Sequence, residues 1–388
     1  MSAARHAMPG KLTRDHRLDF FRGAALFFIF IDHIPGNPLA YLTLKSFAFS
    51  DAAEVFIFIS GYTAALVYGR AMLRDGAVMA SLRIWRRVWQ LYVAHLCIFM
   101  IYTAQVAYAM SHMTNPLFVE NLGVGDFLSR PDITILRVLL LQFQPTYLDI
   151  LPLYIALLVA FPLFILLMRA HVGLAVGLSG LVYGAVQIWG FNLPAHPDDE
   201  VWYFNPFAWQ FLFVIAAALG FRRAQPGSEA TERTPGWITG AAIVVAGFAC
   251  VVQLSWVLHD FIDAVPPLLR RLLWPIEKTT LPPLRLLSVL SLAVLVARFV
   301  PREARFLTSR AGWVVVLCGQ NSLDVFCLSI LLSVLGGIVL TGVGDDLMVV
   351  ALVNLVGMLA MVGLAFGMAW FDAGGRLPQR RLATGIGQ

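Results

Sequence analysis

Long apolar runs, separated by short polar or basic connections, make up most of this chain. An α-helix needs about 20 apolar residues to cross the hydrocarbon core of a bilayer. The runs that approach this length lie at 18–36, 52–70, 87–110, 148–169, 172–190, 207–222, 236–258, 284–300, 312–338 and 347–371. We therefore predict an all-α, polytopic membrane protein with about ten transmembrane helices. Its membrane domain covers residues 18–371, between an N-terminal segment (1–17) and a C-terminal tail (372–388).

The distribution of charge predicts the orientation of this domain. Hydrophobic residues make up 59% of the chain and charged residues 13%, which excludes an ordinary soluble domain. Lys and Arg gather at the N-terminus and in every second connection, whereas the alternate connections are poor in them or acidic, as at Asp345-Asp346. Basic connections face the cytoplasm, so both termini are predicted to be cytoplasmic. The net charge of +5 does not indicate nucleic acid binding, because the basic residues flank apolar runs.

The first apolar run carries ionisable residues at both ends. Arg22 lies near its start, and Asp32 and His33 follow near its end, so helical geometry separates Arg22 from His33 by about 16 Å along the axis. Ionisable residues inside membrane helices are costly and tend to mark function. The near-neutral intrinsic pKa of histidine suits His33 as a general base for a hydroxyl, although a histidine hydrogen-bonded at a helix end is the ordinary alternative. Asp32 cannot share a helix face with His33 and is expected to position another group or to bind an acceptor.

Further carboxylates lie on the predicted extracytoplasmic side, where the first run ends near His33. Glu54, at the start of the second run, is a candidate to orient His33, but Asp51 and Glu54 also fit a helix N-cap with a capping box. Asp149 lies near the start of the fourth run, as a substrate-binding candidate or as an acid favoured by the helix dipole. Two long extracytoplasmic segments are predicted, at about 111–147 and 259–283, and the first includes a short amphipathic helix predicted at 136–141. In the second, Arg270, Arg271 and Lys278 can attract an anionic glycan, an anionic donor or lipid headgroups.

Arginines gather on the predicted cytoplasmic side. Arg83, Arg86 and Arg87 form a cluster in which Arg83 and Arg87 share a helix face. Guanidinium groups match phosphate oxygens, so this cluster and Arg22 are candidates to bind a phosphorylated ligand. The alternative is a positive-inside signal, with Arg22 reaching toward the headgroups.

The segment GQNSLDVF lies in the ninth run and contains Asn321, Ser322 and Asp324. Small and polar residues in apolar helices usually serve close packing. Asp324 is an exception, because a carboxylate deep in an apolar segment needs a partner. The four cysteines lie inside apolar runs without the spacing of a metal site, and we expect no metal.

These motifs carry a family resemblance over most of the chain. The segment RLDFFRGAALFFIFIDH, with its Arg22–His33 spacing, resembles the first-helix signature of the acyltransferase-3 superfamily of membrane acyltransferases. The next block, HIPGNPLAYLTLKSFAFSDAAEVFIFISGYTAALVYGR, resembles the opening of the OpgC branch. QPTYLDILPLYIALL, FNPFAWQFLFV and GQNSLDVFCL follow in family-like order.

The resemblance implies a ten-helix enzyme of the bacterial inner membrane that moves an acyl group from cytoplasmic acyl-CoA to an extracytoplasmic sugar hydroxyl. For the OpgC branch the acyl group is succinyl and the acceptor is osmoregulated periplasmic glucan. By this resemblance His33 is the base and Asp32 the acid beside it, while Arg22 and the cluster of Arg83, Arg86 and Arg87 face the CoA. As a hypothesis from the residues themselves, Asn321 or Ser322 stabilises the oxyanion. The expected partners are acyl-CoA, the glucan and membrane lipids, with no permanently bound cofactor.

The same residues also fit other functions. The nearest is an acetyltransferase acting on another surface or periplasmic glycan. A proton-coupled transporter or flippase can use Arg22, Asp32, His33 and Asp324 as a substrate or proton path, and it predicts no covalent product. A structural or sensor protein requires these intramembrane charges to be incidental.

Overall fold

The computed structural model describes residues 14–112, 122–225, 234–257 and 276–376. These residues form helices and connecting loops, with one isolated bridge between Pro194 and Val201 and no strand among the described residues. The α-helices are α1 (His16–Asp32), α2 (Ala52–His112), α4 (Gly125–Ser129), α5 (Pro131–Leu139), α6 (Ile150–Ala170), α7 (Val172–Trp189), α8 (Pro206–Ala224), α9 (Gly236–Val257), α11 (Pro283–Phe299), α12 (Arg305–Thr308), α13 (Arg310–Gln320), α14 (Ser322–Val343) and α15 (Leu347–Asp372). Two short 3₁₀ helices, η1 (Pro38–Leu42) and η2 (Leu44–Ser46), follow α1. The all-α class predicted from the sequence is confirmed.

Seven described helices are long and apolar enough to cross a membrane: α2, α6, α7, α8, α9, α14 and α15. The helix α2 contains two of the predicted segments, because Gly76 adopts φ 85° and ψ 170° and divides it into two helices. Glycine enters this region without the steric cost that a side chain brings. His171 alone separates α6 from α7. The helix predicted at 136–141 is confirmed only in part, because α5 begins earlier, at Pro131, and ends earlier, at Leu139.

The predicted segment 312–338 is not one helix. It is broken at Asn321, which has φ −104° and ψ 40°, into α13 and α14. The Asn321 side-chain amide donates to the carbonyl oxygens of Leu317 (3.0 Å) and Ala365 (3.4 Å), which stabilises the break. Close packing also fixes α13 against α1, since a Cβ atom on Gly319 would meet the backbone of Asp19.

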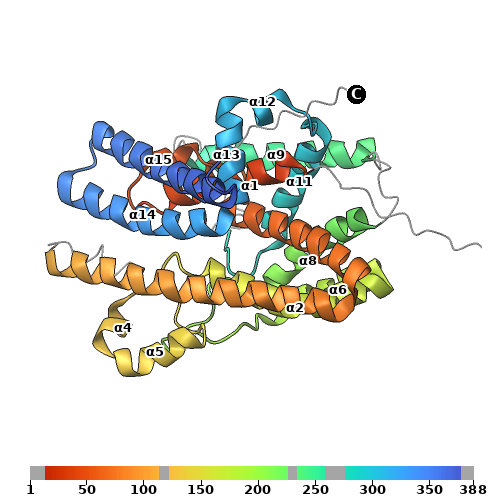
Figure 1. Cartoon of the computed structure of the whole chain (residues 1–388), viewed down its shortest axis with the longest axis horizontal. Coiled ribbons are helices and arrows are strands. Elements are labelled where there is room, and N and C mark those ends of the chain that lie inside the picture. Colours follow the sequence, from red (N-terminus) through yellow and green to blue (C-terminus); the bar gives the residue numbers. More distant parts are fainter. Residues whose placement is uncertain (1–13, 113–121, 226–233, 258–275, 377–388) are drawn as a thin grey trace, which may run out of the picture.

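The helix α1 lies inside the bundle. It packs against α2, α13 and α14, while α2 in turn packs against α6, α8 and α14, and α14 packs beside α15 (Figure 1). The start of α2 has the predicted capping box: the Asp51 carboxylate accepts from the amide of Ala53, and the amide of Asp51 donates to Glu54, both at 2.8 Å. The start of α2 and the end of α1 line one cavity, which contains Asp32 and Ala53.

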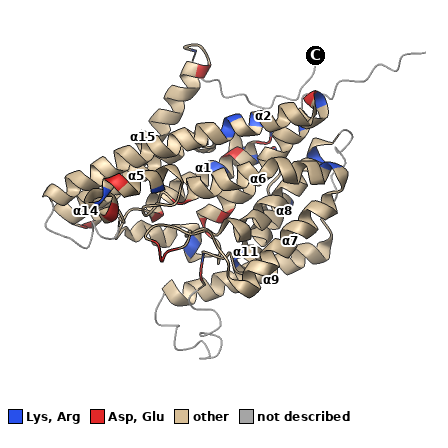
Figure 2. Ribbon diagram, turned by 90° about the horizontal axis from the view of Figure 1, so that it is seen from below, with Lys and Arg blue, Asp and Glu red and all other residues tan. Residues whose placement is uncertain are grey.

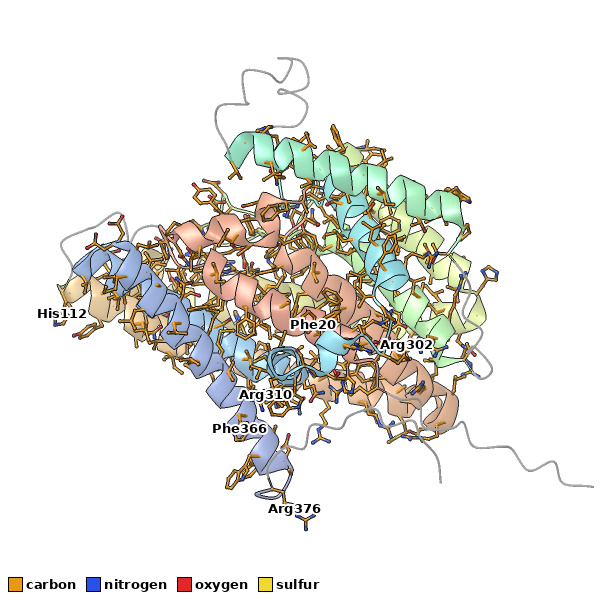
Figure 3. All side chains as sticks on the ribbon, turned by 90° about the horizontal axis from the view of Figure 1, so that it is seen from above. Phe20, His112, Arg302, Arg310, Phe366 and Arg376 are labelled. Carbon is orange, nitrogen blue, oxygen red and sulfur yellow. The ribbon has the colours of Figure 1, made fainter. Side chains whose placement is uncertain are left out.

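Charged residues occupy little of the helical surface, and most of the ribbon carries none (Figure 2). In the view of Figure 3, Arg302, Arg310 and Arg376 lie in the lower half of the picture, with Arg376 at the bottom, whereas His112 lies at the left edge. The basic connections at these arginines are the ones predicted to be cytoplasmic. The end of α2 at His112 belongs to the opposite, predicted extracytoplasmic side.

Candidate active site

One cavity of about 210 Å³ contains two arginines, and we call it the arginine cavity. Arg22 of α1 and Arg87 of α2 line it. The other lining residues are Phe56, Ser60, Thr63, Ala64, Val67, Tyr68, Leu91, Leu151, Tyr154, Ser322, Leu323 and Phe326. Arg22 donates to the hydroxyl of Thr63 (2.7 Å) and to the carbonyl of Ile59 (3.4 Å), but its buried Nε has no partner. In the described parts of the chain neither arginine is paired with a carboxylate, so their charges are free to bind an anion.

The break at Asn321 directs the first turn of α14 toward this cavity. Ser322 and Leu323, the first residues of α14, line it. The amino end of a helix carries a partial positive charge and unpaired amide groups, which favour anions. Two guanidinium groups and a helix amino end therefore suit the arginine cavity to a phosphorylated or carboxylated ligand.

A second cavity of about 200 Å³ contains His33, and we call it the histidine cavity. The other lining residues are Ile29, Asp32, Lys45, Asp51, Ala52, Ala53, Tyr147, Asp149, Ile150, Phe204, Lys278, Phe326 and Ile330. His33 directly follows α1, and its Nδ1 lies 2.5 Å from the carbonyl oxygen of Ile29. A carbonyl oxygen only accepts, so Nδ1 carries the proton, and Nε2 of the neutral ring keeps its lone pair. The Tyr147 ring meets the imidazole edge to face with centroids 4.5 Å apart, which fixes the ring plane.

The carboxylates of the histidine cavity differ in their partners. Asp32 accepts from the hydroxyl of Thr43 (2.7 Å) and pairs with Lys45 (3.2 Å). Asp149, just before α6, has no cationic partner within the described residues, and burial raises its pKa to about 6. An ionised Asp149 therefore retains the capacity to accept hydrogen bonds from a hydroxylated ligand.

A buried ion network borders this cavity, which Asp51 and Lys278 line, and it joins the start of α2 to α11. Asp51 pairs with Lys278 (2.7 Å) and with Arg285 (3.3 Å), and Arg285 pairs with the fully buried Glu54 at 2.6 Å. Burial raises the pKa of the Asp51 carboxyl, but Lys278 and Arg285 overcome this effect and hold it well below its usual range. The ammonium group of Lys278 also lies 5.3 Å from the ring centroid of Phe204. The network thus anchors the segment before α11 against the start of α2.

The structure brings some of the candidate residues predicted from the sequence into one cavity and places others elsewhere. His33, Asp32 and Asp149 meet in the histidine cavity, but Glu54 bonds to Arg285 and to the Asp51 amide and does not line it. His33 is oriented by its own helix and by Tyr147.

Among the arginines, Arg22 and Arg87 line the arginine cavity. Arg83 instead pairs with Asp75 at 2.6 Å, and Arg86 is exposed and lines neither cavity. The residues at 270–271 lie outside the described residues.

The expectation that Asp324 lies deep in an apolar segment is wrong. Because the helix is broken at Asn321, Asp324 falls in the first turn of α14 and is exposed. A carboxylate there is favoured by the helix dipole and needs no buried partner. Ser322 lines the arginine cavity, on the far side of Phe326 from the cavity that holds His33.

Several site residues were not found from the sequence. Tyr147 and Phe326 look like ordinary aromatic residues of apolar segments, and Thr63 like a packing residue. Arg285 offered a signal, because it is a charged residue inside the predicted segment 284–300. Its partner Glu54 is 231 residues away, and only the fold brings them together.

The apolar helices indicate a polytopic α-helical membrane protein, and two cavities lined by charged and apolar side chains lie within its described part. Residues 14–373 match the family described as OpgC protein, which is nearly the whole chain. The chain therefore belongs to the OpgC family, and this membership indicates a glucan-modifying acyltransferase. Neither the curated proteins nor the solved structures give a match.

Proposed function

We propose that the protein transfers an acyl group, with succinyl as the favoured group, from cytoplasmic acyl-CoA to a hydroxyl of an extracytoplasmic glucan in the bacterial inner membrane. The observation that carries this proposal is the placement of two arginines without a carboxylate partner among the described residues, and of His33, in two cavities that share Phe326. The family membership supports the transferase class. The acyl donor, the succinyl group and the acceptor are parts of the proposal.

In this mechanism the arginine cavity holds the anionic part of the donor. CoA carries several phosphates and does not cross a bilayer, but its pantetheine arm is slim and flexible. Arg22 and Arg87 bind phosphate oxygens or other anionic groups of the donor at the predicted cytoplasmic side. The arm then carries the thioester toward the histidine cavity.

His33 acts on the acceptor in the histidine cavity. Because its Nδ1 donates to Ile29, its Nε2 takes the proton of the sugar hydroxyl. The hydroxyl oxygen attacks the thioester carbon, the carbon–sulfur bond breaks, and the proton passes to the departing thiolate. The products are the glucan ester and free CoA. Asp149 and Asp32 accept hydrogen bonds from other hydroxyls of the sugar.

The test is mass spectrometry of extracytoplasmic glucan from cells with the wild-type protein, with His33→Ala and with no protein. We expect one succinyl increment per modified hydroxyl with the wild type only. An acetyl increment would retain the mechanism and change the donor. No increment, with the protein folded in the membrane and donor present, would reject the transferase and direct attention to transport.

A further inference from the structure

The two cavities follow one another along the helix α14. Its first turn lines the arginine cavity through Ser322 and Leu323, and Ile330 lines the histidine cavity. Phe326 stands between them, one turn from each, and lines both. It is the single residue that the two linings have in common.

Two other helices show the same order. On α2, Ala53 lines the histidine cavity and Phe56, the next residue on that face, lines the arginine cavity. At the start of α6, Ile150 lines the histidine cavity and Leu151 the arginine cavity. The cavities are therefore stacked end to end along shared helices, and a thin partition separates them.

The partition consists of aromatic rings. Phe326 is 2% exposed, and its ring lies 6.2 Å from that of Phe56, centroid to centroid. Phe56 is in turn 6.4 Å from Tyr154 of α6. These rings close the route from Arg22 to His33. A ring held mainly by dispersion contacts can change rotamer when a ligand replaces those contacts.

We propose that the two cavities are one donor channel and that Phe326 is its selectivity residue, which limits the acyl groups that reach His33 to short chains. This inference rests on the proposed function for the identity of the donor. The pantetheine arm enters from the arginine cavity, displaces the Phe326 ring and places the thioester beside His33. The histidine cavity, at about 200 Å³, is smaller than the roughly 300 Å³ at which pockets for drug-sized ligands begin. Because it must also admit the acceptor sugar, the space beside His33 favours a short acyl group.

The test compares acyl-CoA donors of increasing length in the purified protein. Acetyl-, succinyl-, butyryl- and hexanoyl-CoA are offered to the wild type and to Phe326→Ala, Phe326→Leu and Phe326→Trp. The matched control is Phe99→Ala, because Phe99 is equally buried, packs against Phe127 and Phe143, and lines neither cavity.

Phe326→Ala removes the ring and is expected to raise the rate with hexanoyl-CoA, relative to acetyl-CoA, by about tenfold. A change of this size is usual when an apolar pocket gains room for at least one more methylene group. Phe326→Leu, which retains an apolar core side chain, gives a smaller change in the same direction. Phe326→Trp lowers succinyl transfer more than acetyl transfer. Phe99→Ala keeps the wild-type ratio. A wild-type ratio in folded Phe326→Ala and Phe326→Leu would overturn the proposal.

A second measurement needs no acyl transfer. Proton permeability is followed with a pH-sensitive dye in proteoliposomes that contain each variant. Phe326→Ala is expected to leak protons faster than the wild type and Phe99→Ala, because the partition is thinner. If no donor supports transfer by the wild type, the proposed function fails. The proton permeability of Phe326→Ala, compared with that of the wild type, then tests whether the two cavities form a channel. Equal permeability in that case would overturn the channel as well.

Discussion

The carbonyl oxygen of Ile29 lies 2.5 Å from Nδ1 of His33, one helical turn later in the chain. The last turn of α1 therefore assigns the two ring nitrogens of His33, so that Nδ1 donates and Nε2 is free to accept a proton. No carboxylate is needed for this orientation, and the edge contact with Tyr147 completes it. A backbone carbonyl cannot be removed by substitution, so the tautomer is protected from mutation of its partner.

Replacement of His33 should abolish transfer without loss of the protein. His33→Ala is expected to lower the rate by about 10²–10⁴-fold, the usual contribution of a general base. The rate is measured as CoA thiol release with donor and glucan present. His112→Ala serves as the control, because His112 is exposed at the end of α2 and lines neither cavity. Full transfer by His33→Ala at normal membrane abundance would contradict the assignment.

Replacement of Arg22 should weaken donor binding. A hydrogen bond to a charged group contributes about 1.5–3 kcal/mol, so Arg22→Ala is expected to raise the KM for acyl-CoA by roughly 10–100-fold. Arg86→Ala is the matched control, since Arg86 is exposed and lines neither cavity. Steady-state kinetics with varied donor at saturating glucan give both values. Equal KM values for the two variants would contradict an anion site at Arg22.

Loss of one partner from the Glu54–Arg285 pair should destabilise the fold. Arg285→Met leaves the Glu54 carboxylate buried without its cation, which costs about 3–5 kcal/mol. Adding Glu54→Gln to Arg285→Met is expected to recover part of this loss. Thermal unfolding of the detergent-solubilised protein measures both effects.

The same pair tests the catalytic role predicted for Glu54. If Glu54 supports structure only, Glu54→Gln lowers the melting temperature but leaves the pH profile of kcat unchanged in the folded fraction. A large fall in kcat at an unchanged melting temperature would instead support catalysis.

The stability of the protein should depend on pH through Asp149. Burial raises the pKa of this carboxyl from 3.8 to about 6, so the folded state favours the protonated form. The contribution of the protonated Asp149 carboxyl to the free energy of unfolding is full below about pH 4. It is lost as the pH rises through about 6, because ionisation of the buried carboxyl in the folded state is costly. Asp149→Asn is expected to lack this decline. Melting temperatures of the wild type and Asp149→Asn between pH 4 and 8 check it, and parallel curves would contradict the shift.

Parts of the site followed from the chain alone. The run from Arg22 to Asp32 is a single helix that His33 caps, so the positions of Arg22 and His33 along its axis are set by helix geometry. The cap at Asp51 and Glu54 is equally local, since it involves residues three apart.

Other parts did not follow. The hydropathy pattern does not predict the break at Asn321, because hydropathy reports how readily a segment transfers to lipid and does not report its backbone conformation. It moved Asp324 from an expected buried position to an exposed first turn and brought Ser322 to the arginine cavity.

The sequence by itself determined the all-α membrane class, the distribution of basic connections and the presence of Arg22, Asp32 and His33 on one helix. These depend on composition and on periodicity within single segments. Only the tertiary structure decided which arginines face a cavity, that Glu54 is bound by Arg285, and that Phe326 separates two cavities in series. The reason is that these relationships join residues from different helices, and helix packing is set by close fit between side chains far apart in the chain.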